Sequence, residues 1–190
     1  MEKPNHRGAV ALNQMAGRVL LLISALIALS AIALGQTSAI TGTLSGFDVN
    51  NDTGVVAHGF EIQIDGLTTN DLYYTGWGQR YGSGTVTPYA TGVYVRWYST
   101  FDPGTSAYFK STPIHVGTPT SSWQDCYAGG AGYATSGCEA LSQGLRYPTP
   151  TGAKATGRWL IDDPNNPGNL IAVNPGVAIP MFITYTIPAP

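Results

Sequence analysis

The stretch from Phe47 to Leu67, FDVNNDTGVVAHGFEIQIDGL, constrains the fold of this chain more than any other. It joins a polar turn at residues 48–54 to a segment, Phe60–Asp65, in which apolar and polar side chains alternate. Period-two alternation places the apolar side chains on one face of a strand and the polar ones on the other. Such strands are typical of antiparallel sheets with one solvated face. We therefore expect Glu61 and Asp65 in solvent, and a turn that holds two strands in register.

Turn signals recur at short intervals through the rest of the chain, and strand patterns lie between them. Strands are expected at Ile40–Leu44, Leu72–Thr75, Thr85–Tyr89, Gly92–Ser99, Ala107–Lys110, Gly157–Asp162, Asn169–Val173 and Met181–Ile187. Pro88 lacks a backbone N–H for a sheet ladder, which favours an edge position for its strand. Many short strands separated by turns predict an all-β sandwich or barrel. We favour an immunoglobulin-like β-sandwich.

One segment reads as helical. Ser136 and Glu139 fit the S-x-x-E capping box, and Gly144 follows at a distance that would end a short helix. The pattern predicts one short helical turn after Cys138, with Glu139 as its cap.

The N-terminal region has the layout of a secretory signal. Basic residues precede an apolar run, VLLLISALIALSAIA, at Val19–Ala33. Such a run is short of the roughly 20 apolar residues that span a bilayer. We assign residues 1–35 to a signal peptide cleaved before Gln36, with cleavage after Ala39 and an uncleaved membrane anchor as alternatives. Residues 36–190 then form a single domain by length.

The charge balance of residues 36–190 argues against a nucleic-acid partner. This part contains ten acidic and six basic side chains. Nucleic-acid binding depends on clustered Lys and Arg side chains that neutralise phosphates. No membrane span is expected after signal cleavage.

The two cysteines, Cys126 and Cys138, both lie in the exported part of the chain. An oxidising compartment favours a disulfide between them, which would close a glycine-rich loop. A metal pair or a catalytic thiol are the alternatives, and neither has a histidine nearby in the sequence.

The turn near the start of the domain suggests calcium. Asp48, Asn50 and Asp52 match D-x-N-x-D, the beginning of a calcium-binding loop whose oxygens converge on one ion. The match then departs from the loop pattern, because Thr53 stands where glycine is needed and Gly59 where the bidentate glutamate belongs. The alternative is that these Asp and Asn side chains only cap the turn through hydrogen bonds to the nearby backbone.

The densest group of aromatic residues lies between Tyr73 and Phe109. Within it, alternation places Tyr94, Arg96 and Tyr98 on one face of a strand, and Trp97 on the opposite, core-facing side. An exposed aromatic stripe can stack on sugar rings or anchor a partner protein. The alternatives are that another layer covers this face, or that cross-strand tyrosine pairs only stabilise the sheet.

Catalytic patterns are weak. The chain has no G-x-S-x-G motif, and only His58 and His115 remain after signal removal. A glycosidase needs two carboxylates across a cleft, for which Glu61, Asp65 and Glu139 are the candidates.

The segments FDVNNDTG…AHGFEIQIDGL, GVYVRWYS and VAIPMFITYTIP, with the Cys126–Cys138 loop, resemble a group of exported β-rich proteins of environmental bacteria. Many members are uncharacterised, and some carry PEP-CTERM sorting tails. The resemblance implies a surface or extracellular location and no catalytic residues. This chain departs from the sorted members, since IPAP ends it without a following apolar helix or basic stop.

Together these patterns favour an exported, non-enzymatic surface or extracellular protein of structural or adhesive function, which self-association would suit. The alternative is a carbohydrate-binding module that uses the tyrosine stripe, and the third hypothesis is a secreted hydrolase. No cofactor is expected other than calcium in the acidic turn.

Overall fold

The computed structural model of the protein describes residues 39–116, 126 and 137–182. In this part of the chain the regular structure consists of β-strands and a single 3-10 turn, η1 (Thr69–Asp71). The all-β expectation is therefore confirmed. Thr68 precedes η1, and its backbone N–H and hydroxyl both donate to Asp71, so this turn has the capping box expected elsewhere.

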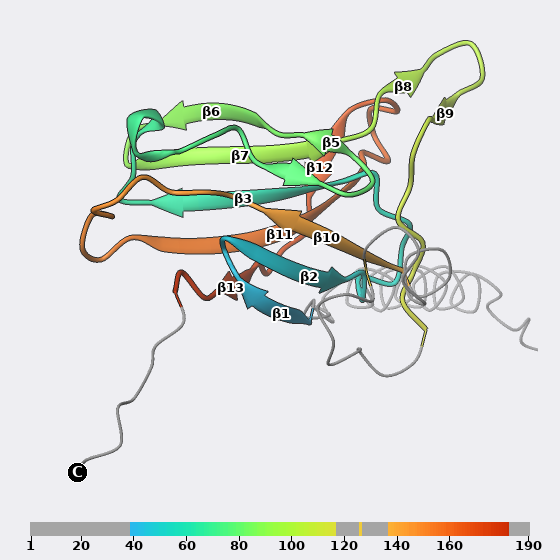
Figure 1. Cartoon of the computed structure of the whole chain (residues 1–190). Helices are drawn as coiled ribbons and strands as arrows, with labels where there is room; N and C mark the ends of the chain where they lie inside the picture. Colours follow the sequence, from blue (N-terminus) through green and yellow to red (C-terminus); the bar gives the residue numbers. More distant parts are fainter. Residues whose placement is uncertain (1–38, 117–125, 127–136, 183–190) are drawn as a thin grey trace, which may run out of the picture. The chain divides into compact units, whose positions relative to one another are not determined.

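Two sheets and one small hairpin contain the described strands, and every pairing is antiparallel. The first sheet has the order β1 (Ile40–Thr43), β2 (Gly46–Asn50), β10 (Cys138–Ser142), β4 (Trp77–Gly78), β5 (Gly82–Ser83). The second has the order β12 (Leu170–Ala172), β11 (Lys154–Asp162), β3 (Gly59–Asp65), β7 (Gly92–Tyr98), β6 (Thr85–Tyr89), and β13 (Val177–Ile179) also pairs with β11. The hairpin is β8 (Phe101–Asp102) with β9 (Ala107–Tyr108) (Figure 1).

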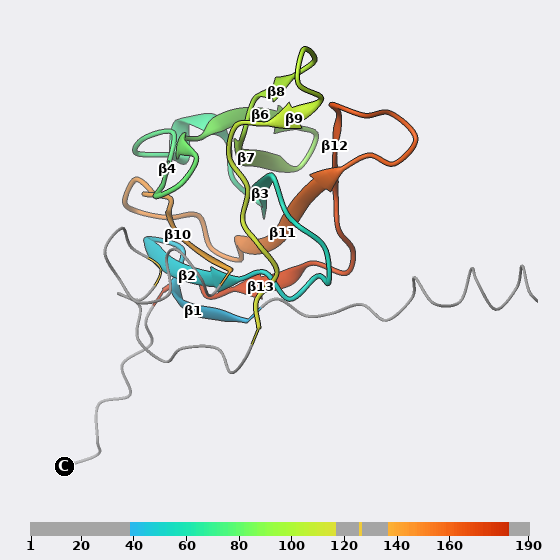
Figure 2. The same cartoon turned by 90° about the vertical axis from the view of Figure 1, so that its right-hand side faces the viewer.

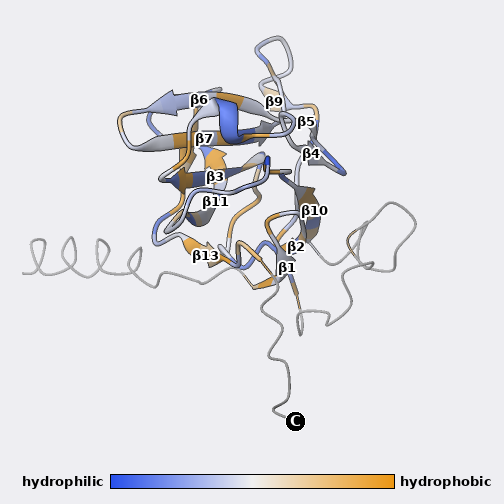
Figure 3. Cartoon of the chain, turned by 60° about the vertical axis from the view of Figure 1, so that its left-hand side comes forward, coloured by the Kyte–Doolittle hydropathy of each residue, from blue (hydrophilic) through white to orange (hydrophobic). Residues whose placement is uncertain are grey.

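The core lies between the two sheets, which gives the molecule its sandwich-like build (Figure 2). The first sheet contributes Phe47, Val49 and Leu141, and the second contributes Phe60, Ile62, Ile64, Val93, Val95, Trp97 and Trp159. The ring of Phe60 meets Trp159 edge-on at 5.0 Å and Phe47 at 6.0 Å. The alternation of hydrophobic and hydrophilic residues along the strands, which produces this burial, can be followed in Figure 3.

The polar turn after β2 does not join two paired strands. β2 lies in the first sheet and β3 in the second, so residues 51–58 carry the chain across the core. The expectation that this turn holds neighbouring strands in register is wrong, because alternation identifies a strand without identifying its partner.

Asn51 organises this crossing. Its side chain is fully buried, and its Nδ2 donates to the carbonyl oxygens of Val55, Thr112 and Pro113. Its Oδ1 accepts a hydrogen bond of 2.6 Å from the Thr53 hydroxyl. The backbone N–H of Asn51 donates to the Gly137 carbonyl oxygen, and its carbonyl oxygen accepts from the His115 N–H. One asparagine thus holds together segments that are far apart in the sequence.

The helical turn expected after Cys138 is wrong, because Cys138–Ser142 is strand β10. It pairs with β2 on one side and β4 on the other. Cys138 and Ala140 lie on one face, and Glu139 and Leu141 on the other. Long-range pairing on both edges outweighs the local capping pattern.

The remaining strand expectations have mixed outcomes. β6 is an edge strand, as Pro88 predicted, and the strands expected near β1, β7, β9, β11 and β12 are present. Leu72–Thr75 is not a strand, although Leu72 forms an isolated bridge with Leu145. β13 was not expected. The signal segment, most of the disulfide loop and most of Met181–Ile187 lie outside the described residues, and no helix within the described part is long and apolar enough to cross a membrane.

Candidate functional site

The outward face of the second sheet forms the candidate site. Three strands, β7, β3 and β11, align residue by residue across this face. Tyr98 stands opposite Gly59, which stands opposite Leu160. The next outward row consists of Arg96, Glu61 and Arg158, and we call it the guanidinium row.

An open groove of about 770 Å³ lies at the Tyr98 end of this face. It is lined by Thr85, Thr87, Arg96, Tyr98, Ser99, Thr100, Phe101, Tyr108, Leu160, Gly168, Asn169 and Leu170. The lining combines aromatic rings with hydroxyl and amide groups, which is the mixture that binds a ligand with both apolar faces and polar edges.

The three side chains predicted to form an exposed stripe share the outward face, but they have different surroundings. Tyr98 is 48% exposed and lines the groove together with Arg96. Tyr94 packs against Tyr89, with ring centroids 4.6 Å apart, and the Arg96 guanidinium lies 5.6 Å from its centroid. Tyr94 is therefore half-buried beneath its neighbours and does not line the groove, so it supports Arg96 from below.

The β8–β9 hairpin forms one wall of the groove through Phe101 and Tyr108, and sequence reasoning did not single it out. Tyr108 contacts Phe101 edge-on at 5.0 Å, and its hydroxyl donates to Asp162 at 2.8 Å. The His58 ring stacks on the Tyr108 ring, with the two centroids 4.0 Å apart. Desolvation and then the Asp162 hydrogen bond raise the pKa of Tyr108. These contacts fix the ring before any ligand arrives.

His58 belongs to this wall. Its Nδ1 lies 3.0 Å from the Ser111 hydroxyl, and burial lowers the pKa of the imidazole.

The guanidinium row corrects the expectation that Glu61 is solvated. Only 2% of Glu61 is exposed, because Arg96 and Arg158 cover its carboxylate from the two neighbouring strands. The Arg96 Nε donates to Glu61 Oε2 at 2.6 Å, and the Arg158 Nη1 lies 3.5 Å from Oε1. Arg158 also donates to Gln63 at 2.9 Å and to Asn174 at 3.1 Å. Alternation placed Glu61 on the correct face but could not reveal that arginines would cover it.

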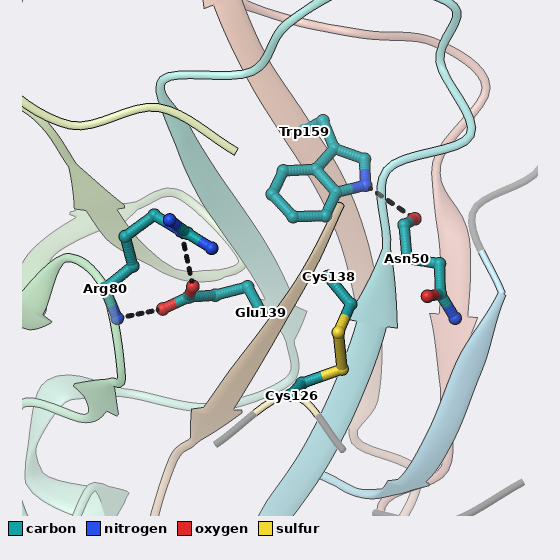
Figure 4. Close-up of a disulfide and its surroundings, with 6 residues drawn as sticks. All are labelled: Asn50, Arg80, Cys126, Cys138, Glu139 and Trp159. Atoms are coloured by element: carbon teal, nitrogen blue, oxygen red, sulfur yellow. Dashed lines mark hydrogen bonds and ion pairs between the residues drawn. A yellow bond between two sulfur atoms is a disulfide. The ribbon is translucent and has the colours of Figure 1, made fainter. Parts of the chain in front are cut away.

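The third carboxylate considered for catalysis lies on the inward face of the first sheet. Glu139 is fully buried, accepts from the backbone N–H of Arg80, and forms an ion pair at 3.3 Å with the Arg80 Nε (Figure 4). Burial raises the pKa of Glu139 to about 7, and Arg80 opposes this rise. Asp65, the other candidate, accepts from the Gln63 amide at 3.2 Å and from the Tyr89 hydroxyl. The three carboxylates are thus all engaged by neighbouring donors.

The disulfide between Cys126 and Cys138 is present, with Cα atoms 5.4 Å apart (Figure 4). This confirms the sequence prediction and indicates an oxidising compartment. Cys138 lies in β10 directly opposite Asn50 of β2, whose carbonyl accepts a hydrogen bond from the Trp159 indole at 3.1 Å. The bridge is therefore attached at a point where the two sheets are joined.

The three candidate calcium ligands lie in β2 and in the turn that follows it. Asp48 and Asn50 lie within the strand and are almost fully buried, whereas Asp52 lies in the turn and is partly exposed. The described residues contain no group of three or more His, Cys, Asp or Glu side chains that could hold a metal ion. The calcium expectation stays a prediction.

Several residues of the site could not be found from the sequence. Phe101 and Tyr108 come from a short hairpin, Gly168 and Asn169 from the turn after β11, and Leu170 from the start of β12. These residues meet only because of the sheet order. The signal available in advance was the density of aromatic residues up to Phe109, which did not specify which rings face solvent.

A scan against protein-family models and searches of curated proteins and of solved structures gave no match to this chain.

Proposed function

We propose that this protein is an exported, non-enzymatic adhesion protein that binds carbohydrate chains in the groove on the second sheet. One observation supports this most directly. Tyr98 presents an exposed ring to a groove that is also lined by the fixed rings of Phe101 and Tyr108. Sugar rings offer an apolar face for stacking and hydroxyl groups at their edges.

The polar lining suits the edges of a sugar ring. Thr85, Thr87 and Ser99 supply hydroxyl groups that can both donate and accept, and Asn169 supplies a side-chain amide. The open form of the groove also suits a chain that continues beyond the site, as a polysaccharide does.

Export is the second part of the proposal. Its support is the basic and apolar N-terminal pattern of residues 1–35 and the disulfide, which forms and persists in oxidising compartments. We further propose that the sandwich has immunoglobulin-like topology, for which the support is two antiparallel sheets of short strands around one core.

The test compares Tyr98→Ala with Tyr147→Ala. Tyr147 is 96% exposed and is not among the residues that line the groove, so it controls for the loss of a surface tyrosine. Binding is measured by glycan array, by pull-down on insoluble polysaccharides, and by titration with the best ligand. We expect Tyr98→Ala to weaken binding about thirtyfold, the loss of an aromatic hot spot of about 2 kcal/mol. Tyr147→Ala should bind like the parent protein.

Two results would contradict the proposal. If arrays and pull-downs show no binding, the carbohydrate function is wrong, and self-association in analytical ultracentrifugation would then favour a structural role. If binding is unchanged in Tyr98→Ala, the sugar site lies elsewhere.

A further inference from the structure

We propose that the groove selects acidic polysaccharides, and that Arg96 binds a uronic-acid carboxylate beside the sugar ring stacked on Tyr98. This inference rests on the proposed carbohydrate function and specifies its ligand class. It is carried by the guanidinium row, which holds two guanidinium groups and one carboxylate on adjacent strands.

The row has surplus positive charge. Glu61 can neutralise only one of the two arginines, although both lie against its carboxylate. Besides Glu61, Arg158 donates to the uncharged amide oxygens of Gln63 and Asn174. The surplus therefore has no acidic partner within the row, and it can attract an anionic ligand.

The exposed end of the row lies in the groove. The side chain of Arg96 is 48% exposed, whereas that of Arg158 is 19% exposed, so Arg96 is the one that a ligand reaches more easily. Arg96 directs Nε and Nη2 to Glu61, and Nη1 has no partner among the described residues. Because Glu61 and the Tyr94 ring hold this guanidinium in place, little rotamer entropy is lost when a carboxylate binds.

The spacing suits a sugar with a carboxylate. Arg96 and Tyr98 are two residues apart on the same face of β7, a separation of about 7 Å along the strand. A ring stacked on Tyr98 can thus direct a substituent toward Arg96. A single surplus charge suits a polymer with separated carboxylates better than a nucleic acid, which needs several clustered cations.

Three carboxylates, those of Asp102, Asp162 and Asp163, adjoin the groove, and each accepts hydrogen bonds from neighbouring donors. Among the described residues that line it, Arg96 is the one that is charged at neutral pH. Asp162 lies behind the Tyr108 wall, where its Oδ1 accepts from the Tyr108 hydroxyl and from the Gly168 N–H. Both hydrogen bonds direct this carboxylate toward donors in the wall.

The experiment uses one polymer in two forms. Polygalacturonate and the same preparation after carboxyl reduction differ in charge and share their backbone, and dextran sulfate supplies a sulfated comparison. Binding of the purified, disulfide-intact protein is titrated at low and physiological ionic strength. We expect polygalacturonate to bind at least about tenfold more tightly than its reduced form, and salt to narrow the difference.

The variants separate charge from geometry. Arg96→Gln should lose the preference for the acidic polymer, and Arg96→Lys should retain only part of it, because an ammonium group cannot form the planar fork that matches a carboxylate. Arg96→Lys keeps a cation beside Glu61 and so tests the idea even if Arg96→Gln unfolds. Lys154→Gln, at the opposite end of the same face, removes the same charge outside the groove and should leave the preference unchanged.

The outcomes distinguish a failure of the acidic preference from a failure of the proposed carbohydrate-binding function. Equal binding of both forms of polygalacturonate overturns the acidic preference and leaves the carbohydrate function standing. Absence of binding to every polysaccharide tested overturns both. Tighter binding of dextran sulfate than of polygalacturonate overturns the carboxylate assignment, and an unchanged preference in Arg96→Lys and Arg96→Gln overturns the role of Arg96.

Discussion

Replacing Glu139 with glutamine should change how the stability of this protein depends on pH. Glu139 is buried on the inward face of β10, where removal from water disfavours its charged form and raises its pKa from 4.5 to about 7. In the unfolded chain the same carboxyl group ionises near its ordinary pKa. Glutamine keeps the shape and one acceptor oxygen of glutamate, and it does not ionise.

The sign and size of the effect follow from proton binding. Between pH 4.5 and about 7 the unfolded state loses the Glu139 proton while the folded state retains it. The free energy of unfolding of the parent protein therefore falls over this range, by about 3 kcal/mol from this group, and levels off above it. Glu139→Gln lacks this contribution, so its stability relative to the parent should rise by that amount with increasing pH.

Urea unfolding at a series of pH values from 4 to 8, followed by tryptophan fluorescence, would measure the effect with the disulfide intact. The difference between variant and parent is the relevant quantity, because other groups titrate identically in both. His58 is one of these, and its lowered pKa makes stability rise with pH in the range just below 6.5. A constant difference would show that Arg80 fully compensates the burial of Glu139. A difference of opposite sign would show that the ion pair dominates.

Three further changes test the fold. Asn51→Ala should lower the free energy of unfolding by about 3 kcal/mol in urea titrations, because the loss of its three Nδ2 hydrogen bonds costs about 1 kcal/mol each; an unchanged midpoint would contradict this role. Gly59→Ala should cost about 1–3 kcal/mol by thermal unfolding, since a Cβ there would lie 2.4 Å from a backbone oxygen of β7, whereas Gly46→Ala, with open space around it, should be close to neutral. Reduction of Cys126–Cys138 should destabilise the protein by about 3 kcal/mol, and an intact mass that does not increase on reduction would show that the bridge is absent.

Local patterns in the sequence predicted local structure well. Alternation located β3 and β7, Pro88 indicated an edge strand, and the two cysteines predicted their bridge. These features depend on the chemistry of one residue or on a few neighbours. Composition and turn spacing were sufficient for the all-β class.

The predictions that were wrong concerned residues whose structure depends on partners distant in the sequence. The capping pattern at Glu139 satisfied every local criterion for a helix, yet pairing with β2 and β4 made the segment a strand. Glu61 is polar and lies on an outward face, yet arginines from two other strands bury it. The lining of the groove could be predicted only in part for the same reason, because a hydrogen bond to Asp162 on another strand holds Tyr108 at the site.

The crossing held by Asn51 also bears on the order in which the chain can fold. Its side chain bonds to Thr112 and Pro113, 61 and 62 residues further along, and its backbone to Gly137. The entropy of closing such long loops is lost before these contacts stabilise anything, which slows folding of β-rich topologies. A nascent chain that has not yet reached Gly137 cannot complete the crossing, and the turn near its N-terminal end remains immature until then. The crossing can therefore form only after β1–β9 have been synthesised, while β11, β12 and β13 are still to follow.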